Sequence, residues 1–409
     1  MRILIESPFL LAGDNLDLLK NAYVLIDNEL IAEVGTGERP QAEKKISFKN
    51  EIIIPGLINS HVHIGDSAFK DQGLGKSVND LFKPPNGLKH RLLEHTETKI
   101  LVQAVKDSLN DMLRCGTTTF ADFREGSIKG AKILLEALRN NNIRGLILGR
   151  PDHVFSKSQI EKNQGKIPSN FLAQLNELFD MTQGLALSSP NDITDEAMRQ
   201  LADLAIKYKK LRAIHASEAP DSRNISVERS GFTEIERAIR FFDVNLLVHL
   251  TYASREDLDK VAKTETPVVI CPRANASLGL KLPPITKMHD LGITVCLGTD
   301  NVMINQPNMF REMEFTLKAY RMERASSQYP NPRDILCMAT INGARALGIG
   351  HKTGSIKEGK SADLAIINMN KNLRNVNDIY SALVHRTGAE DILTVLLRGE
   401  FSYGYKIWN

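Results

Sequence analysis

Between residues 55 and 350 the chain alternates short apolar runs with longer amphipathic stretches, and this alternation constrains the fold more than any other feature. The runs are Gly56–Gly65, Thr117–Glu125, Ile143–Asp152, Gly184–Asp192, Leu211–Glu218, Asn245–Ser254, Pro267–Asn275 and Ile293–Asn301. Strands that alternate with helices indicate β-α units and a parallel sheet. Eight such units predict a closed (β/α)8 barrel.

The intervening stretches carry the signals of helices that could cover this sheet. Thr194 precedes Asp195 and Glu196 at the start of an apolar-periodic stretch, and Ser254 with Asp257 resembles a capping box. An open doubly wound sheet would place its ligand at one switch point, whereas polar residues here finish nearly every strand. That pattern favours the barrel, whose site collects residues from many strand ends.

The two ends of the chain have a different pattern. Strand-like segments are Met1–Ser7, Ala22–Asp27 and Glu29–Gly35 at the start, and Leu364–Asn368, Ile392–Arg398 and Phe401–Lys406 at the end. Neither end has enough strands for a core of its own, so we expect both to form one small β-sandwich. The predicted domains are residues 1–54 and 352–409 for the sandwich and 55–351 for the barrel.

Composition excludes several classes of protein. With 409 residues, 42% hydrophobic and 25% charged, the chain has the composition of an ordinary soluble globular protein. A net charge of +3 gives no case for a nucleic-acid partner, and no apolar run is long enough to span a membrane. The four separated cysteines are expected to be reduced, which indicates a cytoplasmic protein. We expect a small-molecule substrate and, as for most soluble enzymes, a homodimer.

His61 and His63 lie where the first buried strand meets its loop, after Pro55-Gly56. Because side chains alternate along a strand, both imidazoles face the same side, where they could bind one metal ion. Paired histidines also occur as ordinary half-buried strand residues, so this motif alone leaves both interpretations open.

Three further strand ends carry residues of the same kind. The fifth run brings His215 and, three residues later, Glu218; the sixth brings His249; the eighth brings Asp300. His215 and Glu218 suit a third metal ligand and a proton carrier. Each could be an ordinary buried polar group, but a single site on one barrel rim explains all of them together.

Five motifs resemble the amidohydrolase superfamily, in the branch of cytosine deaminase, guanine deaminase and related chlorohydrolases, over essentially the whole chain. They are Pro55 to His63 (PGLINSHVH), His215 to Glu218 (HASE), Cys271 to Asn275 (CPRAN), Gly298 to Asp300 (GTD) and Gly354 to Leu364 (GSIKEGKSADL). The resemblance implies that His61, His63, His215 and Asp300 hold the metal. It also implies that His249 assists as an electrophile and that Glu218 moves protons.

One divalent metal ion is expected. Two-metal members of the superfamily carry a modified lysine at the end of the fourth strand, where this chain has Ser188 and Ser189. Zinc suits these ligands, with iron(II) as the alternative. Such an ion can lower the pKa of a bound water from 15.7 to about 7, which would supply hydroxide at neutral pH.

Substrate contacts are predicted less directly. Arg273 could recognise a carbonyl or carboxylate through its fork of donors, and Arg150 ends the third strand. His90 lies in the long segment Asp66–His95, which is expected to be a lid, a substrate loop or a packing loop at a subunit contact.

The sequence therefore predicts a metal-dependent aminohydrolase that deaminates an aminated N-heterocycle of nucleobase, nucleoside or pterin type. A first alternative is hydrolysis of an amide or C–Cl bond by the same site. A second alternative is an inactive barrel that serves as a scaffold.

Overall fold

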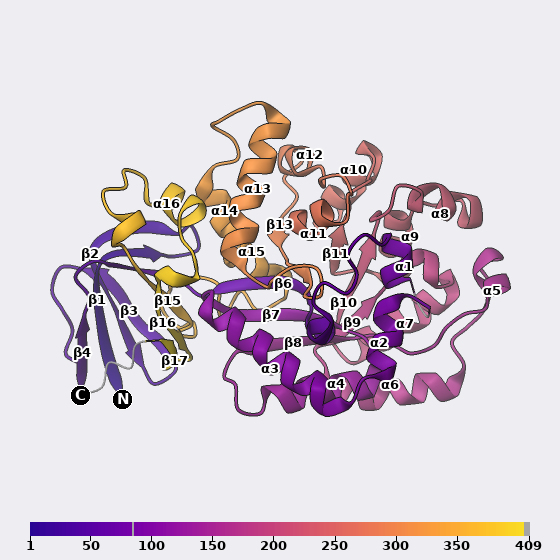
Figure 1. Cartoon of the computed structure of the whole chain (residues 1–409), viewed down its shortest axis with the longest axis horizontal. Coiled ribbons are helices and arrows are strands. Elements are labelled where there is room, and N and C mark those ends of the chain that lie inside the picture. Colours follow the sequence, from indigo (N-terminus) through magenta and orange to yellow (C-terminus); the bar gives the residue numbers. More distant parts are fainter. Residues whose placement is uncertain (84–85, 405–409) are drawn as a thin grey trace.

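A parallel sheet curled into a barrel forms the larger part of the molecule, seen in a computed structural model that describes residues 1–83 and 86–404 (Figure 1). Its strands are β6 (Leu57–His63), β7 (Thr117–Arg124), β8 (Arg144–Gly149), β9 (Gly184–Leu187), β10 (Leu211–Ala216), β11 (Leu246–His249), β12 (Val268–Ile270), β13 (Val295–Leu297) and β14 (Asp300–Asn301). Every expected run contains a strand.

The barrel closes through an interrupted eighth strand. β13 pairs with β12, while β14, which follows after only Gly298 and Thr299, pairs with β6 in the register Asp300↔Val62. β13 and β14 thus act as one strand, whose first part pairs with β12 and whose second part pairs with β6. The predicted (β/α)8 fold is confirmed, and the closure brings the ends of β6 and β14 side by side.

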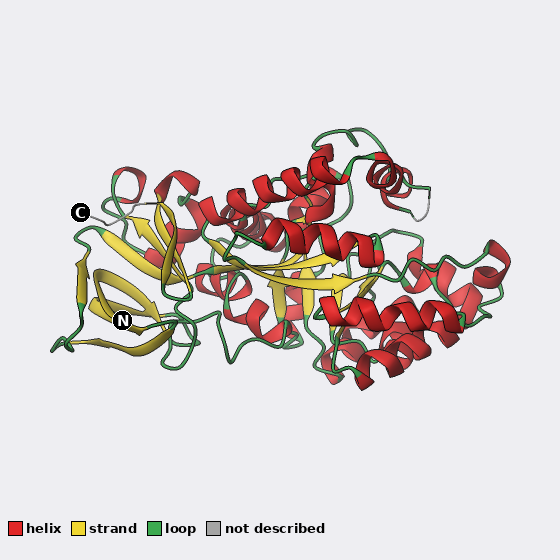
Figure 2. Cartoon of the chain, turned by 90° about the horizontal axis from the view of Figure 1, so that it is seen from below, coloured by secondary structure: helices red, strands yellow, loops and turns green. Residues whose placement is uncertain are grey.

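Helices surround the barrel, as Figure 2 shows. They are α1 (Val78–Phe82), α2 (Leu88–His95), α3 (Thr98–Arg114), α4 (Ser127–Leu138), α5 (Lys157–Glu161), α6 (Ser169–Met181), α7 (Asp195–Lys207), α8 (Ser222–Ser230), α9 (Glu234–Phe242), α10 (Arg255–Lys263), α11 (Pro272–Ser277), α12 (Ile285–Asp290), α13 (Met309–Arg324), α14 (Pro332–Met338), α15 (Ile341–Ala346) and α16 (Ile379–His385). Short 3-10 helices are η1 (Ile64–Phe69), η2 (Pro190–Asp192), η3 (Lys371–Leu373) and η4 (Ala389–Asp391). Thr194 caps α7 and Ser254 forms a capping box on α10, as expected.

Alternation along the strands divides the core into two layers. On β7, Ala121 and Phe123 belong to the cluster inside the barrel, whereas Phe120 packs in the layer between the barrel and its helices. Because successive side chains point to opposite faces, each strand contributes to both layers. The polar residues at the strand ends therefore lie above a layer of packed apolar side chains.

Strands from both ends of the chain form a second, separate sheet beside the barrel (Figure 1). They are β1 (Arg2–Ala12), β2 (Asp17–Asp27), β3 (Leu30–Thr36), β4 (Lys44–Ser47), β5 (Glu51–Pro55), β15 (Leu364–Asn368), β16 (Ile392–Leu397) and β17 (Glu400–Gly404). β5 joins the N-terminal strands of this sheet to the C-terminal ones, because it pairs with both β1 and β15. The small β domain built from both termini is confirmed, while its predicted limits at residues 54 and 352 stay predictions.

Two expectations extend beyond the described residues. The last predicted strand ran to residue 406, and residues 405 and 406 lie outside the described part, as do Pro84 and Pro85 of the expected lid segment. Within the described part, that segment folds as η1, α1 and α2. None of the described helices is both long and apolar enough to cross a membrane.

Candidate active site

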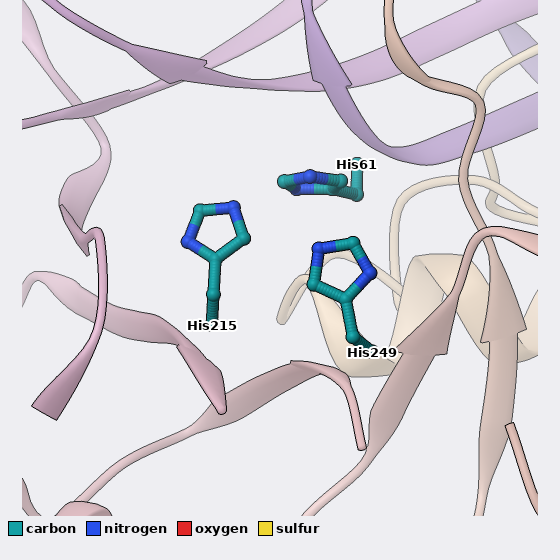
Figure 3. Close-up of side chains that lie close together, drawn as sticks. All are labelled: His61, His215 and His249. Atoms are coloured by element: carbon teal, nitrogen blue, oxygen red, sulfur yellow. The ribbon is translucent and has the colours of Figure 1, made fainter. Parts of the chain in front are cut away.

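Three histidines from β6, β10 and β11 point their rings toward a common space (Figure 3). The ring centroids of His61 and His215 are 5.0 Å apart, those of His61 and His249 are 5.8 Å apart, and those of His215 and His249 are 5.4 Å apart. One ring nitrogen from each lies within 4.8 Å of the others. A single cation could therefore contact all three.

His63 and Asp300 complete a second, overlapping group around His61. The Oδ1 atom of Asp300 is 3.3 Å from Nε2 of His61 and 3.6 Å from Nε2 of His63. The pairing of β14 with β6 explains this, because it places the aspartate beside the two histidines. The structure thus brings together all four predicted ligands, and it brings His249 equally close.

Backbone contacts fix the orientation of two of these rings. Nδ1 of His63 lies 3.0 Å from the carbonyl oxygen of Phe123, and Nδ1 of His215 lies 3.0 Å from that of Leu187. A carbonyl only accepts, so each Nδ1 must carry the proton and each Nε2 must present a lone pair. The two Nε2 atoms are 3.3 Å apart. Two facing lone pairs repel unless a proton or a metal ion lies between them.

His61 supplies an independent sign of a missing partner. Its ring is fully buried, and among the described residues neither of its nitrogens has a hydrogen-bond partner, since the 3.3 Å contact with Asp300 is poorly aligned. Buried polar atoms are almost always satisfied. The donor set of imidazoles and one carboxylate therefore fits a divalent transition-metal ion.

Electrostatics hold these groups in the protonation states that metal ligands need. Burial lowers the pKa of His61 to about 3 and takes that of His215 well below its usual range. Burial alone would raise the pKa of Asp300, but the contact with His61 and the neighbouring imidazoles keep it well below its usual value. The neutral imidazoles of His61 and His215 and the ionised carboxylate of Asp300 can bind metal without releasing protons.

Glu218 and His249 line the same small cavity of about 160 Å³ as three of the candidate ligands, His63, His215 and Asp300. Oε1 of Glu218 is 3.7 Å from Nε2 of His249. Ser217, just before Glu218, has a left-handed backbone with φ of 50°, as does His249 with φ of 73°. Strained backbone of this kind concentrates at functional sites, because it turns side chains that follow a strand into the site.

A carboxylate and a lysine that sequence reasoning did not assign to the site lie behind His63. Oε1 of Glu125 is 2.8 Å from Nδ1 of His63 and 2.5 Å from Nζ of Lys89. Burial and Lys89 lower the pKa of His63, but Glu125 more than offsets them, so the pKa is raised overall. Glu125 directly follows β7, a position that could have indicated a site residue, whereas nothing in the sequence around Lys89 on α2 indicated one.

Glu234 is a second residue that the sequence did not single out. It is buried in the wall of the cavity, where its carboxylate accepts hydrogen bonds from the Ser217 backbone N–H at 2.7 Å and the Ser189 hydroxyl at 2.5 Å. Burial raises its pKa to about 7. Glutamate is common in the first turn of a helix, so the position of Glu234 at the start of α9 gave no reason to predict this contact.

The three predicted substrate contacts divide into two groups. Arg150 and His90 lie together, with Nη2 of Arg150 3.4 Å from Nδ1 of His90, and Arg150 also donates to Ser188. Burial lowers the pKa of His90 to about 4. Arg150 lines the small cavity and also a larger adjoining one of about 1090 Å³, which His90 lines too.

Arg273 is not brought to this place. Its Nη1 lies 3.6 Å from Oε2 of Glu312 on α13 and 3.3 Å from the carbonyl oxygen of Gln306, and it lines neither cavity of the described residues. The reason is local: the chain enters α11 directly after β12, and this turn directs the side chain toward α13. A role of Arg273 in substrate binding stays a prediction without a contact to support it.

The model of the amidohydrolase family matches residues 52–401. The chain belongs to the amidohydrolase family. This confirms the family resemblance that the five sequence motifs indicated. As a family member, the chain is a hydrolase with a site of metal-binding type.

Two curated relatives and one solved structure are similar to this amidohydrolase over nearly the whole chain. A putative aminohydrolase of Methanothermobacter thermautotrophicus is 37% identical, with 97% of this chain and 98% of that protein covered. A 5-methylthioadenosine/S-adenosylhomocysteine deaminase of Clostridium tetani is 30% identical, covering 98% and 93%. The solved adenosine deaminase of Xanthomonas campestris with bound zinc has a TM-score of 0.86 at 20% identity, covering 98% of this chain and 93% of that one.

Proposed function

We propose that this amidohydrolase is a metal-dependent aminohydrolase that releases ammonia from an aminated N-heterocycle of nucleobase, nucleoside or pterin type. The observation that carries the proposal is the convergence of His61, His63, His215 and Asp300 beside the cavity that Glu218 and His249 line. Similarity to proteins named as deaminases supports the reaction type.

His61, His63, His215 and Asp300 would hold one divalent ion, with zinc as our choice and iron(II) as the alternative. When bound, the ion supplies Lewis acidity and a water whose pKa falls to about 7. Ser188 and Ser189 follow β9, so no lysine is available at this strand end for a second ion. Glu125 would steady His63 through its Nδ1.

Glu218 would carry the proton. It faces the cavity while only half-buried, so it can accept a proton from the attacking water and donate it to a ring nitrogen of the substrate. A second transfer to the exocyclic nitrogen lets the C–N bond break and ammonia leave. His249, whose Nε2 lies 3.7 Å from Glu218, would stabilise the negative charge that develops on the oxygen bound to the attacked carbon.

The test is ammonia release by zinc-loaded protein across a panel of aminated purines, pyrimidines, nucleosides and pterins. Glu218→Gln should lower kcat by roughly 10²–10⁴-fold, the usual contribution of general acid–base catalysis, and should leave the zinc content unchanged. Glu228→Gln, an exposed glutamate on α8, is the matched control and should keep full activity.

Other outcomes point to other functions. Carboxylate or chloride release without ammonia would favour hydrolysis of an amide or C–Cl bond. Protein that contains no metal and takes none up would favour the inactive scaffold. Zinc-loaded protein that releases nothing from the whole panel would contradict the proposal.

The proposal also covers the oligomeric state, the kind of substrate and the cellular location of the protein. We infer a homodimer that acts on a small molecule in the cytoplasm. Sedimentation of the purified protein tests the homodimer, and fractionation of cells tests the cytoplasmic location.

A further inference from the structure

A large cavity adjoins the catalytic one and shares part of its wall. The cavity of about 1090 Å³ and the catalytic cavity are both lined by Arg150, Ser188 and Ser189. A reacting ring at the candidate metal ligands could therefore carry a substituent that extends into the larger space. The chemistry of the far wall then decides which substituent fits.

Arg124, the last residue of β7, lines this larger cavity although its side chain is only 1% exposed. In the part of the chain that the structure describes, its Nε and Nη1 atoms have no hydrogen-bond partner. The nearest carboxylate oxygen, Oδ2 of Asp122, is 3.7 Å from Nη1, beyond hydrogen-bond distance. A buried guanidinium without hydrogen bonds is costly, so a ligand that accepts from it would be favoured.

Two glycines make room for this guanidinium. A Cβ atom on Gly65 would lie 2.3 Å from Nη1 of Arg124, and one on Gly130 would lie 3.1 Å from its Nε. Any larger residue at Gly65 would displace the arginine. The side chain therefore reaches the cavity through a passage that these two positions leave open.

The N-terminus of α4 opens on the same corner of the cavity. Gly126, Lys129 and Gly130 line it; Gly126 caps the 12-residue helix without a side-chain hydrogen bond, and the first turn has no acidic residue. A helix N-terminus attracts anions through its free N–H groups and dipole. The nearby carboxylate of Glu125 is already paired with Lys89, and the remaining acidic residues of the cavity lie on other segments; they are Glu94, Asp152, Glu161 and Asp192.

We propose that Arg124, Lys129 and the N-terminus of α4 form a subsite for an oxyanion, a phosphate or carboxylate, at the end of a substituent on the substrate. This assignment rests on the proposed function, because it places the reacting ring at the candidate metal ligands. It narrows the substrate to heterocycles with an anionic substituent.

Calorimetry of zinc-loaded protein with the Glu218→Gln change, which slows turnover, tests the subsite. The probes are inorganic phosphate, acetate, adenosine and adenosine 5′-monophosphate. Arg124→Met should weaken binding of the preferred free anion and of the monophosphate by roughly tenfold or more, as loss of charge-assisted hydrogen bonds does, and leave adenosine unchanged. Lys129→Gln should weaken both anions by about threefold.

Lys132→Gln is the control, since it removes the same charge from the same helix but does not line the large cavity. It should change none of the affinities. Asp122→Asn combined with Arg124→Met removes both members of the buried pair and serves if the single variant does not fold. Preference for phosphate over acetate, or the reverse, identifies the oxyanion.

Anion affinities that do not change in the Arg124 and Lys129 variants would overturn the subsite. An Arg124-dependent affinity for free phosphate, without tighter binding of the monophosphate than of adenosine, would overturn its link to the substrate. Ammonia release from uncharged heterocycles alone, with no anion effect, would leave the proposed function standing while the subsite fails.

Discussion

At the scale of single residues, the two ring nitrogens of His63 and of His215 have different roles in the site. In His63 and His215 one nitrogen is fixed by a backbone carbonyl, and the other is left to face its counterpart at 3.3 Å. The carbonyls belong to Phe123 and Leu187 on neighbouring strands, so the barrel itself sets the tautomers. A metal ion bound between the two Nε2 atoms would relieve the repulsion that this arrangement creates.

Zinc should therefore stabilise the protein measurably. At a free zinc concentration of 100 times Kd the gain is about 2.7 kcal/mol, which calorimetry would detect as a higher Tm. Asp300→Asn removes the anionic ligand and should weaken zinc binding by at least roughly a hundredfold. Asp290→Asn, an exposed aspartate with 51% of its side chain accessible, is the control. An equal zinc-induced shift in the Asp300 variant would contradict the ligand assignment.

Glu234 should act as a positioning residue, because it bonds the Ser217 backbone that directs Glu218. Glu234→Ala should lower kcat by roughly 10–100-fold, as displacement of a catalytic group by about 1 Å does, with little change in KM or zinc content. Glu234→Gln should recover most of the activity, since its amide can accept from Ser217 and donate to Ser189. Equal losses in both variants would argue against positioning.

At the scale of elements, the interrupted eighth strand is what joins the two halves of the site. Between β13 and β14, Thr299 makes two hydrogen bonds with Asn59 of β6: its N–H donates to Oδ1 at 3.1 Å, and its hydroxyl oxygen accepts from Nδ2 at 2.7 Å. Gly298 lies against His61. The break in the strand thus fixes Asp300 relative to the His61 and His63 pair.

Gly298→Ala should disturb this junction. A Cβ atom there would lie 2.7 Å from both Cβ and the carbonyl oxygen of His61, so the backbone of a candidate ligand must shift. Overpacking of this kind costs about 1–3 kcal/mol, and we expect a lower free energy of unfolding in urea together with weaker zinc binding. Unchanged zinc affinity would show that the junction does not set the ligand geometry.

At the scale of the whole molecule, charged contacts tie the terminal sheet to the barrel. Asp14, in the turn between β1 and β2, lies 3.1 Å from Arg345 of the barrel helix α15 and accepts hydrogen bonds from Ser355 and Lys360. Burial raises the pKa of Asp14, but these hydrogen bonds lower it to about 2. The folded value lies below the usual 3.8, so ionised Asp14 favours the folded state.

Its contribution should be complete above about pH 4 and should disappear as the pH falls from 4 to 2. Asp14→Asn should lower the free energy of unfolding by about 1–2 kcal/mol at pH 7, a value reduced for partial exposure, and by less as the pH approaches 2. Urea denaturation across this range measures both. Asp203→Asn, an exposed residue of α7, should show no such dependence. A penalty that is constant with pH would contradict the electrostatic origin.

The sequence by itself determined the barrel, the terminal β domain and the strand-end positions of His61, His63, His215, His249 and Asp300. These follow from local patterns, because apolar alternation sets each strand and parallel strands end at the same rim. Tertiary structure alone decided that Lys89 pairs with Glu125, that Glu234 holds the turn before Glu218, and that Arg273 turns toward Glu312. Each of these contacts joins segments far apart in the chain, and their geometry depends on how helices pack around the barrel, which no local pattern records.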